Sequence, residues 1–315
     1  MSNCTKTTVP LLSARALRLP GVCLALLALA VASGCTVASA QRRATTAGPD
    51  IPDLPNLVTV IPFELTGNEP ERTKVLIPAD IGGHRGMFIL DTGDPRVDVN
   101  RDYVKSSPTG GLDTVAAGEP VPQGEEHVRV PMRIGTLQLP HPIDAVVDHV
   151  FNGFNMRSPR LGNIGLSALE PFETIIDYAH QRLVLIRLDS AGHRLATVPA
   201  YPPTTMVPLV PYAKLWWGVK GLLSGVEDSL LIDTGNPWNT LLETTRQQVA
   251  THLTQTTPGT TENVKLDHLG LAGGVFDDVL FVVGNDDSDV LGFGFLSRLG
   301  TVGFNFRTHH LILYH

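Results

Sequence analysis

Cysteine is almost absent from this chain. Only three occur in 315 residues, and all lie near the start, at Cys4, Cys23 and Cys35. The rest of the chain therefore has no disulfide and no thiol nucleophile, which excludes both a disulfide-stapled scaffold and a cysteine hydrolase. Its stability must come from a hydrophobic core, and a chain of this length is long enough to bury one.

Positive charge is also scarce. The chain has 24 Lys and Arg against 31 Asp and Glu, a formal net charge of −7. The stretch before Cys35 holds three of the basic residues and no acidic one, which leaves 21 basic against 31 acidic residues in the remainder. Nothing in it resembles the basic patch that nucleic acid requires, so we expect no nucleic-acid partner.

Long hydrophobic runs are missing except for one, at residues 19–32. It is shorter than the roughly 20 residues of a transmembrane helix. Three basic residues precede it, at Lys6, Arg15 and Arg18. A charged start followed by a short apolar run is typical of a secretory signal peptide. We therefore predict a signal peptide over residues 1–34, followed by a tether at 35–56.

Two processing sites compete at the end of this run. The segment Ala32-Ser33-Gly34-Cys35 resembles a bacterial lipobox, although Ala32 stands where Leu is usual. That resemblance implies lipidation of Cys35 and a protein anchored in the cell envelope, facing the periplasm or the exterior. The alternative is cleavage after Ala40, in Ala38-Ser39-Ala40, which would give a secreted protein.

Helix-length periodic segments are rare, whereas glycine (30) and proline (24) are frequent. Short apolar runs separated by such turn residues are typical of strands. We therefore expect an all-β fold. The one clear helix that the pattern predicts runs from Glu243 to Thr254.

The chain repeats its own order of motifs. Each half has a hairpin that ends in Asp-Thr-Gly, then an apolar run, an apolar-Gly element with a short helical turn, and a final pair of strands. These segments are 75–81, 87–93, 143–147, 164–169 and 174–186 in the first half, and 217–223, 230–235, 279–283, 291–296 and 301–313 in the second. A duplication of about this size predicts two similar lobes. We place them at 57–190 and 204–315, with a linker at 191–203.

The two triplets, Asp91-Thr92-Gly93 and Asp233-Thr234-Gly235, contain the candidate catalytic residues. One triplet alone would be an ordinary turn. Two at matching places of a repeat predict that both carboxylates meet at a pseudo-twofold axis. Two carboxylates about 3 Å apart cannot both ionise, so they share a proton. One then acts as a base on water and the other as an acid, with no metal and no cofactor.

From Val58 to His315 the sequence resembles the retropepsin-like and pepsin-like aspartic proteases, and is most similar to bacterial forms with two retropepsin-like lobes on one chain. The markers are Phe88 to Gly93, Leu231 to Gly235, and the apolar-Gly elements at 164–166 and 291–293. The resemblance implies a bilobal pepsin-like fold and an aspartic endopeptidase that acts on polypeptides as a monomer. It implies that Asp91 and Asp233 are catalytic, and that Thr92 and Thr234 bond across to the opposite loop.

The chain departs from the family pattern after each triplet. The family usually has Ser, Thr or Ala there, whereas this chain has Asp94 and Asn236. The Asn236 side chain could still donate a hydrogen bond to the carboxylate, and the Asp94 charge would raise the proton affinity of Asp91 if it lay close. These departures leave an alternative open, a catalytically silent lipoprotein that binds extended peptides on the same fold.

The family covers its cleft with hairpin flaps. The candidate in the first half is Ala117–Gly124, with Gly118, Pro120 and Pro122, and its counterpart is Thr254–Thr261. For each, an ordinary mobile loop is at least as good an interpretation.

Other motifs are better explained as ordinary structural features than as functional sites. The acidic segment 285–289 lacks the spacing of a calcium-binding loop, and Ser167 is not in a nucleophile motif. Trp216 and Trp217 could line a cleft, but packing in the core or between lobes is favoured. A metal site at His141, Asp144, Asp148 and His149 is disfavoured because alternate strand residues point to opposite faces. Surface positions are expected for His309, His310 and His315.

Overall fold

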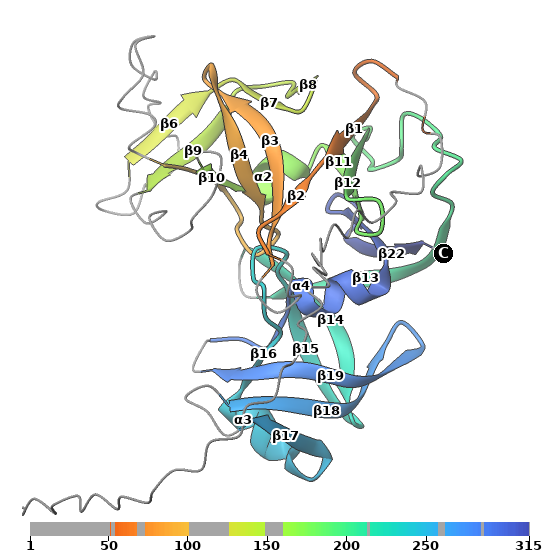
Figure 1. Ribbon diagram of the computed structural model, residues 1–315. Helices are drawn as coiled ribbons and strands as arrows, with labels where there is room; N and C mark the ends of the chain where they lie inside the picture. The colour runs from red at the N-terminus through yellow and green to blue at the C-terminus, as the bar shows by residue number, and fades with distance from the viewer. Residues whose placement is uncertain are drawn as a thin grey trace, which may run out of the picture. The chain divides into compact units, whose positions relative to one another are not determined.

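The computed structural model describes residues 51, 54–67, 73–100, 126–148, 160–212, 215–257, 262–284 and 287–314 (Figure 1). The predicted signal peptide and the first candidate flap lie outside these ranges. No helix within them is long and apolar enough to cross a membrane.

The first half is built on a hairpin of two strands, β3 and β4. The sheet runs in the order β6-β9-β5-β10-β4-β3-β7-β8, with β2 beside β3. The bounds are β2 Glu64–Leu65, β3 Val75–Ile81, β4 His84–Leu90, β5 Val97–Asn100, β6 Glu126–Val130, β7 Met132–Ile134, β8 Leu137–Gln138, β9 Ile143–Asp148 and β10 Arg160–Ile164.

The second half is built on the equivalent hairpin, β14 and β15. Its strands follow the order β13-β14-β15-β20-β16-β19-β18-β17. The bounds are β13 Pro203–Tyr212, β14 Trp216–Leu223, β15 Val226–Ile232, β16 Thr240–Leu242, β17 Leu253–Thr257, β18 Glu262–Leu271, β19 Gly274–Gly284 and β20 Val290–Leu291.

The duplication predicted from the sequence is present in the strand pairing. In the first half β4 runs parallel to β10, which is antiparallel to β5. In the second half β15 runs parallel to β20, which is antiparallel to β16. A short helix follows each of these elements, α2 at Leu166–Leu169 and α4 at Phe293–Leu296. The two Asp-Thr-Gly triplets therefore follow the same strand in both halves.

A third layer is shared by both halves. Strands β1 (Val58–Pro62), β11 (Phe172–Asp177) and β12 (Arg182–Arg187) come from the first half. They join β21 (Thr301–Asn305), β22 (His310–Tyr314) and β13 from the second, through the antiparallel pair β11–β21. We call this the shared sheet. The shared sheet links the two halves by main-chain hydrogen bonds, so the linker does not divide the chain into two independent bodies. The predicted lobe boundaries at 190 and 204 stay predictions.

Both central hairpins turn on two residues. Gly82 and Gly83 have φ of 56° and 88°, and Ser224 and Gly225 have φ of 48° and 95°. Two consecutive positive φ angles are the signature of a type I′ turn, whose twist matches that of the flanking strands. The flanking strands continue right up to these two-residue turns.

The predicted helix Glu243–Thr254 was too long. Helix α3 covers Glu243–Gln248, a 3₁₀ turn follows at Ala250–His252, and β17 begins at Leu253. Leu253 packs against the core and pairs with Leu266 of β18. The β-branched residues in this stretch lower its helix propensity, so the last part pairs as a strand instead of extending the helix.

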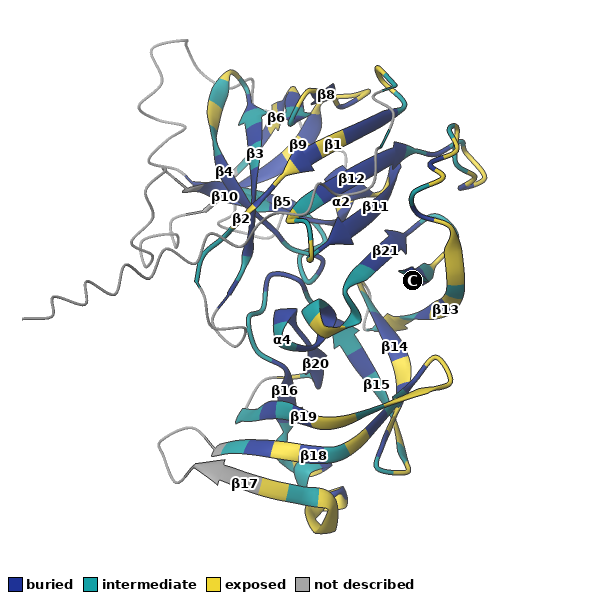
Figure 2. Cartoon of the chain, turned by 45° about the vertical axis from the view of Figure 1, so that its right-hand side comes forward, coloured by how far each residue is buried: buried dark blue, intermediate teal, exposed yellow. Residues whose placement is uncertain are grey.

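One hydrophobic cluster extends through both halves. It includes the fully buried Phe88, Phe172, Phe281, Phe295 and Phe304. Strands β11 and β12 are buried along nearly their whole length, as the dark blue in Figure 2 shows. A continuous core of this kind fixes the ends of β4 and β15, from which the site is built.

Candidate active site

Each loop that carries an Asp-Thr-Gly triplet, the candidate catalytic loop of its half, is held from behind by the apolar-Gly element of that half. The Asp91 N–H donates to the Ile164 carbonyl at 3.0 Å, and the Asp233 N–H donates to the Leu291 carbonyl at 3.1 Å. The next residue must be glycine. A Cβ at Gly165 would lie 1.8 Å from a carbonyl oxygen of the catalytic loop, and one at Gly292 would lie 2.0 Å from the equivalent oxygen.

The two loops are joined by their threonines. The Thr92 N–H donates to Thr234 Oγ1 at 3.0 Å, and the Thr234 N–H donates to Thr92 Oγ1 at 3.1 Å. Each hydroxyl then donates to the carbonyl before the opposite triplet, Thr92 to Ile232 at 3.0 Å and Thr234 to Leu90 at 2.8 Å. Both threonines are almost completely buried. These are the cross-loop hydrogen bonds that the family resemblance implies.

The two carboxyl groups face each other across this junction. A Cβ placed on Gly93 would lie 2.3 Å from Cγ of Asp233, and one on Gly235 would lie 2.2 Å from Cγ of Asp91. Each carboxyl thus packs on the bare Cα of the opposite glycine. The two carboxyl groups are close enough for each to change the pKa of the other.

The environment of the pair favours a shared proton. Burial raises the pKa of Asp91 well above its usual range, and repulsion from the Asp233 carboxylate adds to the rise. Burial also raises the pKa of Asp233, although its hydrogen bonds to Asp91 and to backbone N–H groups oppose the rise. Both residues remain partly accessible to solvent, so a water molecule can reach them.

The two carboxylates accept different numbers of backbone hydrogen bonds. Oδ1 of Asp233 accepts from the N–H groups of Gly235 at 2.8 Å and Asn236 at 3.0 Å. Oδ1 of Asp91 accepts from the Gly93 N–H at 3.1 Å. The N–H groups of Asp94 and Asn236 also donate to the carbonyl of Asp91 and Asp233 respectively, each at 3.3 Å. The pseudo-twofold symmetry is therefore broken at the carboxyl groups by one additional hydrogen bond, from the Asn236 N–H to Asp233.

The two unusual residues after the triplets brace the loops. Asp94 Oδ1 accepts from the Arg96 N–H at 2.9 Å, and Asn236 Oδ1 accepts from the Trp238 N–H at 3.0 Å. The Asn236 group that supports Asp233 is its backbone N–H, which corrects the expectation of a side-chain donor. The Asp94 charge does raise the pKa of Asp91, after the larger effects of burial and of Asp233.

Two further residues lie beside the carboxyl pair: the sequence left cleft lining open for Trp216 but favoured packing, and it gave no signal for Lys74. Trp216 Nε1 donates to the Gly93 carbonyl at 2.7 Å, and the Lys74 charge lowers the pKa of both Asp91 and Asp233. They occupy equivalent positions. Lys74 lies two residues before the partner of Ile89, and Trp216 two residues before the partner of Leu231. No local motif marks these positions, because they depend on strand register.

A third residue holds the second loop. Asn239 is buried, and its Oδ1 accepts from the N–H groups of Gly292 at 3.0 Å and Phe295 at 3.2 Å, while Nδ2 donates to the Leu280 carbonyl at 2.8 Å. It fixes helix α4 behind the catalytic loop of the second half. An isolated asparagine in a turn sequence gives no signal of this role.

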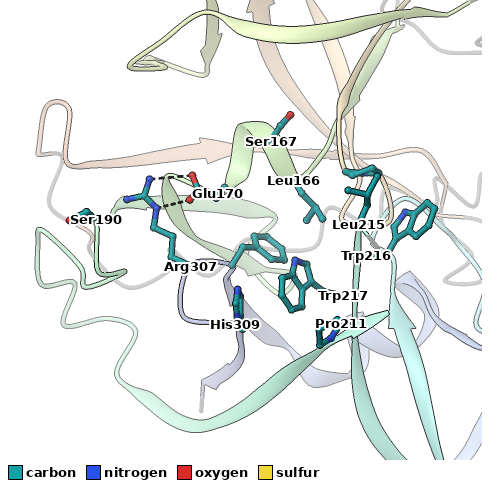
Figure 3. Close-up of a pocket in the computed structure, with 12 residues that line it drawn as sticks. Leu166, Ser167, Glu170, Ser190, Pro211, Leu215, Trp216, Trp217, Arg307 and His309 are labelled. Atoms are coloured by element: carbon teal, nitrogen blue, oxygen red, sulfur yellow. Dashed lines mark hydrogen bonds and ion pairs between the residues drawn. The ribbon is translucent and has the colours of Figure 1, made fainter. Parts of the chain in front are cut away.

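A groove of about 800 Å³ is lined by residues of both halves, from Pro95 and Leu166 to Trp216 and Trp217. Figure 3 shows its lining side chains. Leu215 and Trp216 stand together at one edge. Trp217 points toward His309, on which it stacks with ring centroids 4.2 Å apart. At the other end Glu170 and Arg307 form an ion pair with an N–O distance of 2.8 Å. The packing interpretation therefore fits Trp217, whereas Trp216 lines a groove.

The remaining candidates are not part of the carboxyl pair. Ser167 and His309 are exposed and line the groove, and His310 is partly buried. In the described part of the chain no group of three or more His, Cys, Asp or Glu is placed to hold a metal ion. The second candidate flap is the β17–β18 hairpin, whose tip at 258–261 is not among the described residues. Residues 117–124, His149 and His315 also lie outside them.

Comparison with known proteins gives one line of evidence. No protein-family model matches the chain, and no curated protein matches its sequence. Among solved structures it is similar to an aspartic proteinase from Irpex lacteus, with 14% sequence identity and a TM-score of 0.52. The match covers 82% of this chain and 97% of the fungal one. The chain therefore has the all-β, bilobal fold of the pepsin-like aspartic proteinases.

Proposed function

We propose that this protein is an aspartic endopeptidase that hydrolyses peptide bonds with a water molecule activated by Asp91 and Asp233. One observation carries the proposal. The two carboxyl groups lie at the junction of two loops, each packed on the glycine of the opposite triplet, and they are close enough for each to change the pKa of the other. The cross-loop threonine bonds keep that geometry in place before substrate arrives.

The proton of the resting pair belongs mainly on Asp91. Asp233 Oδ1 has two backbone donors, which stabilise its ionised form, whereas Asp91 has one and lies in the field of Asp94. Asp233 is then the base and Asp91 the acid. The pair still titrates as a unit, so both groups determine each limb of a pH–rate profile.

Hydrolysis on this arrangement needs no covalent intermediate. The ionised Asp233 takes a proton from water as the water oxygen attacks the scissile carbonyl carbon. Asp91 gives its proton to the carbonyl oxygen, which becomes a hydroxyl of the tetrahedral intermediate. Collapse of the intermediate breaks the C–N bond: Asp233 gives its proton to the leaving amine, and one hydroxyl of the intermediate returns its proton to Asp91 as the carboxylic acid forms. The two residues thus exchange roles during one turnover.

A silent peptide-binding protein is the second candidate function. The observation in its favour is that the Asp94 and Asn236 side chains brace their own loops, so neither supports a catalytic carboxylate as a family hydroxyl would. Such a protein would hold an extended peptide between the halves without cutting it.

A single experiment separates the two functions. The purified full chain, kept in detergent, is incubated with a mixed peptide library from acid to neutral pH, and the products are read by mass spectrometry. Endopeptidase activity predicts internal cleavage that disappears in Asp91→Asn. Binding of library peptides without any cleavage at any pH would favour the silent binder.

We also propose that the protein is tethered to a membrane by a lipid on Cys35. The lipobox-like sequence before it supports this proposal, and the described residues contain no membrane-spanning helix. A periplasmic or exterior protease held in this way would act on polypeptides close to the membrane surface. A secreted form cut after Ala40 is the competing proposal.

A further inference from the structure

Gly93 is in contact with both carboxyl groups of the candidate pair. Its N–H donates to Oδ1 of Asp91 at 3.1 Å, and its Cα lies so close to Asp233 that a Cβ would be 2.3 Å from Cγ of that residue. A movement of the Gly93 backbone would therefore weaken a hydrogen bond to one carboxylate and the packing of the other. Whatever fixes this backbone also fixes the geometry of the pair.

The carbonyl of Gly93 is held from the second half of the chain. Trp216 Nε1 donates to it at 2.7 Å. The backbone of Trp216 is itself fixed, because it begins β14 and pairs with Tyr212 of β13. The indole thus ties the first candidate catalytic loop to a sheet of the other half. This tie is separate from the threonine bonds, which act one residue earlier in each triplet.

The first loop depends on such a tie more than the second. If Gly235 moved, Asp233 would keep the hydrogen bond from the Asn236 N–H at 3.0 Å. The backbone donor described for Asp91 is Gly93 itself. A residue that fixes Gly93 therefore protects the weaker of the two sets of backbone hydrogen bonds.

We propose that Trp216 is a positioning residue for peptide hydrolysis: its indole N–H holds the Gly93 carbonyl, and so keeps Gly93 where it supports both carboxyl groups. This inference rests on the proposed function and adds a residue to its machinery. Trp216 acts through the N–H of its ring, and the apolar surface of the ring is not required. Phenylalanine, which keeps an aromatic ring and lacks the donor, should therefore fail to replace it.

The kinetic test compares the full chain in detergent with Trp216→Phe and Trp216→Ala, on a fluorogenic peptide that the wild type cuts. Trp216 is 36% exposed, so neither change opens a cavity in the core. Leu222→Ala is the matched control, because Leu222 is also an exposed apolar residue of β14, at 50%. Circular dichroism checks that every variant is folded.

Both Trp216 variants should lower kcat by about 10-fold, the effect of losing one hydrogen bond between neutral groups. KM should change by less than about twofold, because the lost support acts on the reacting carboxyl groups. The pH–rate profile should also shift to higher pH in both variants, since ionised Asp91 loses part of its support. Leu222→Ala should behave as wild type. Wild-type kcat in Trp216→Phe, or an effect on KM alone, would overturn the proposal, and a rise in kcat/KM would show that the indole obstructs the site instead.

A measurement without substrate keeps this inference separate from the proposed function. The carboxyl carbons of ¹³C-labelled aspartates are titrated by NMR in the wild type and in Trp216→Phe, with Asp91→Asn and Asp233→Asn for assignment. The titration of Asp91 should move to higher pH in Trp216→Phe, while that of the distant Asp289 should not move. If this shift is seen in a protein that cuts nothing, only the endopeptidase proposal fails. An unchanged Asp91 titration shows that Trp216 does not position the pair.

Discussion

Gly235 lies against the Asp91 carboxyl group so closely that a Cβ on this glycine would be 2.2 Å from Cγ of Asp91. Gly93 has the same relationship to Asp233, at 2.3 Å. The third residue of each triplet thus has a steric role in the opposite half. No L-amino acid with a side chain fits either position unless the catalytic carboxyl moves.

The first prediction follows from this contact. Gly93→Ala and Gly235→Ala should each lower kcat/KM by at least about 100-fold, because a displacement of about 1 Å at reacting groups costs that much. Gly274→Ala is the control, since its nearest contact would be 3.4 Å and it lies in a distant hairpin. Cleavage of a fluorogenic peptide measures the effect. Near-normal activity in either variant would mean that the carboxyl groups do not need this packing.

The second prediction concerns the carboxyl groups themselves. Asp91→Asn and Asp233→Asn should each reduce peptide hydrolysis by more than about 10³-fold, because neither residue can supply both the acid and the base. The melting temperature should be no lower than in the wild type, since each change removes repulsion between two close acids. Asp144→Asn, an exposed carboxylate on β9, is the control. Full activity in either variant would disprove the paired mechanism.

The sequence predicted the parts of the site that local motifs and the repeat encode. Asp91 and Asp233 are found from a triplet that occurs twice, and the two halves have the predicted order of elements. The pairing of β11 with β21 was not predicted, because no periodic pattern marks contacts between segments so far apart in the chain. For the same reason Lys74 was missed, and packing was favoured for Trp216 over cleft lining. Their places beside the carboxyl pair follow only from strand register.

Cys35 supplies the third prediction. Cys35→Ser should abolish incorporation of a clickable fatty acid and release the protein from the membrane fraction, because a thioether-linked lipid requires the thiol. Peptidase activity should be retained, since Cys35 precedes the folded halves in the sequence. Cys23→Ser, within the predicted signal peptide, is the control. A wild type that takes up no label would favour cleavage after Ala40.

The fourth prediction concerns two charged residues beside the carboxyl pair, which shift its pKa in opposite directions. Asp94 raises the pKa of Asp91, whereas Lys74 lowers the pKa of both carboxyl groups. Asp94→Ser should therefore shift the pH–rate profile to lower pH, and Lys74→Gln should shift it to higher pH. Serine can still accept the Arg96 N–H, so the loop should keep its turn. The measurement is kcat/KM as a function of pH over the whole pH range in which the enzyme is active. Shifts of both variants in the same direction would contradict the electrostatic account.

The last prediction concerns a second carboxyl pair, away from the site. Asp289 is buried, and its carboxylate accepts from the Leu242 N–H at 2.6 Å and the Thr245 hydroxyl at 2.7 Å. Burial raises its pKa to about 6, and a hydrogen bond with Asp228 and repulsion from that carboxylate contribute to the rise. Tyr212 also lies in the field of both carboxylates.

A raised carboxyl pKa means that the folded state binds the proton more tightly than the unfolded state. The stabilisation by this proton is full below the usual value of 3.8 and is lost as the pH rises through about 6. Asp289→Asn is neutral at every pH, so its melting temperature should fall less than that of the wild type between pH 4.5 and 7. Asp287→Asn, an exposed neighbour in the same loop, should follow the wild type. Equal pH dependence in the wild type and Asp289→Asn would show that this pair does not hold the proton, and the loss of stability near neutral pH would then have to come from Asp91 and Asp233 alone.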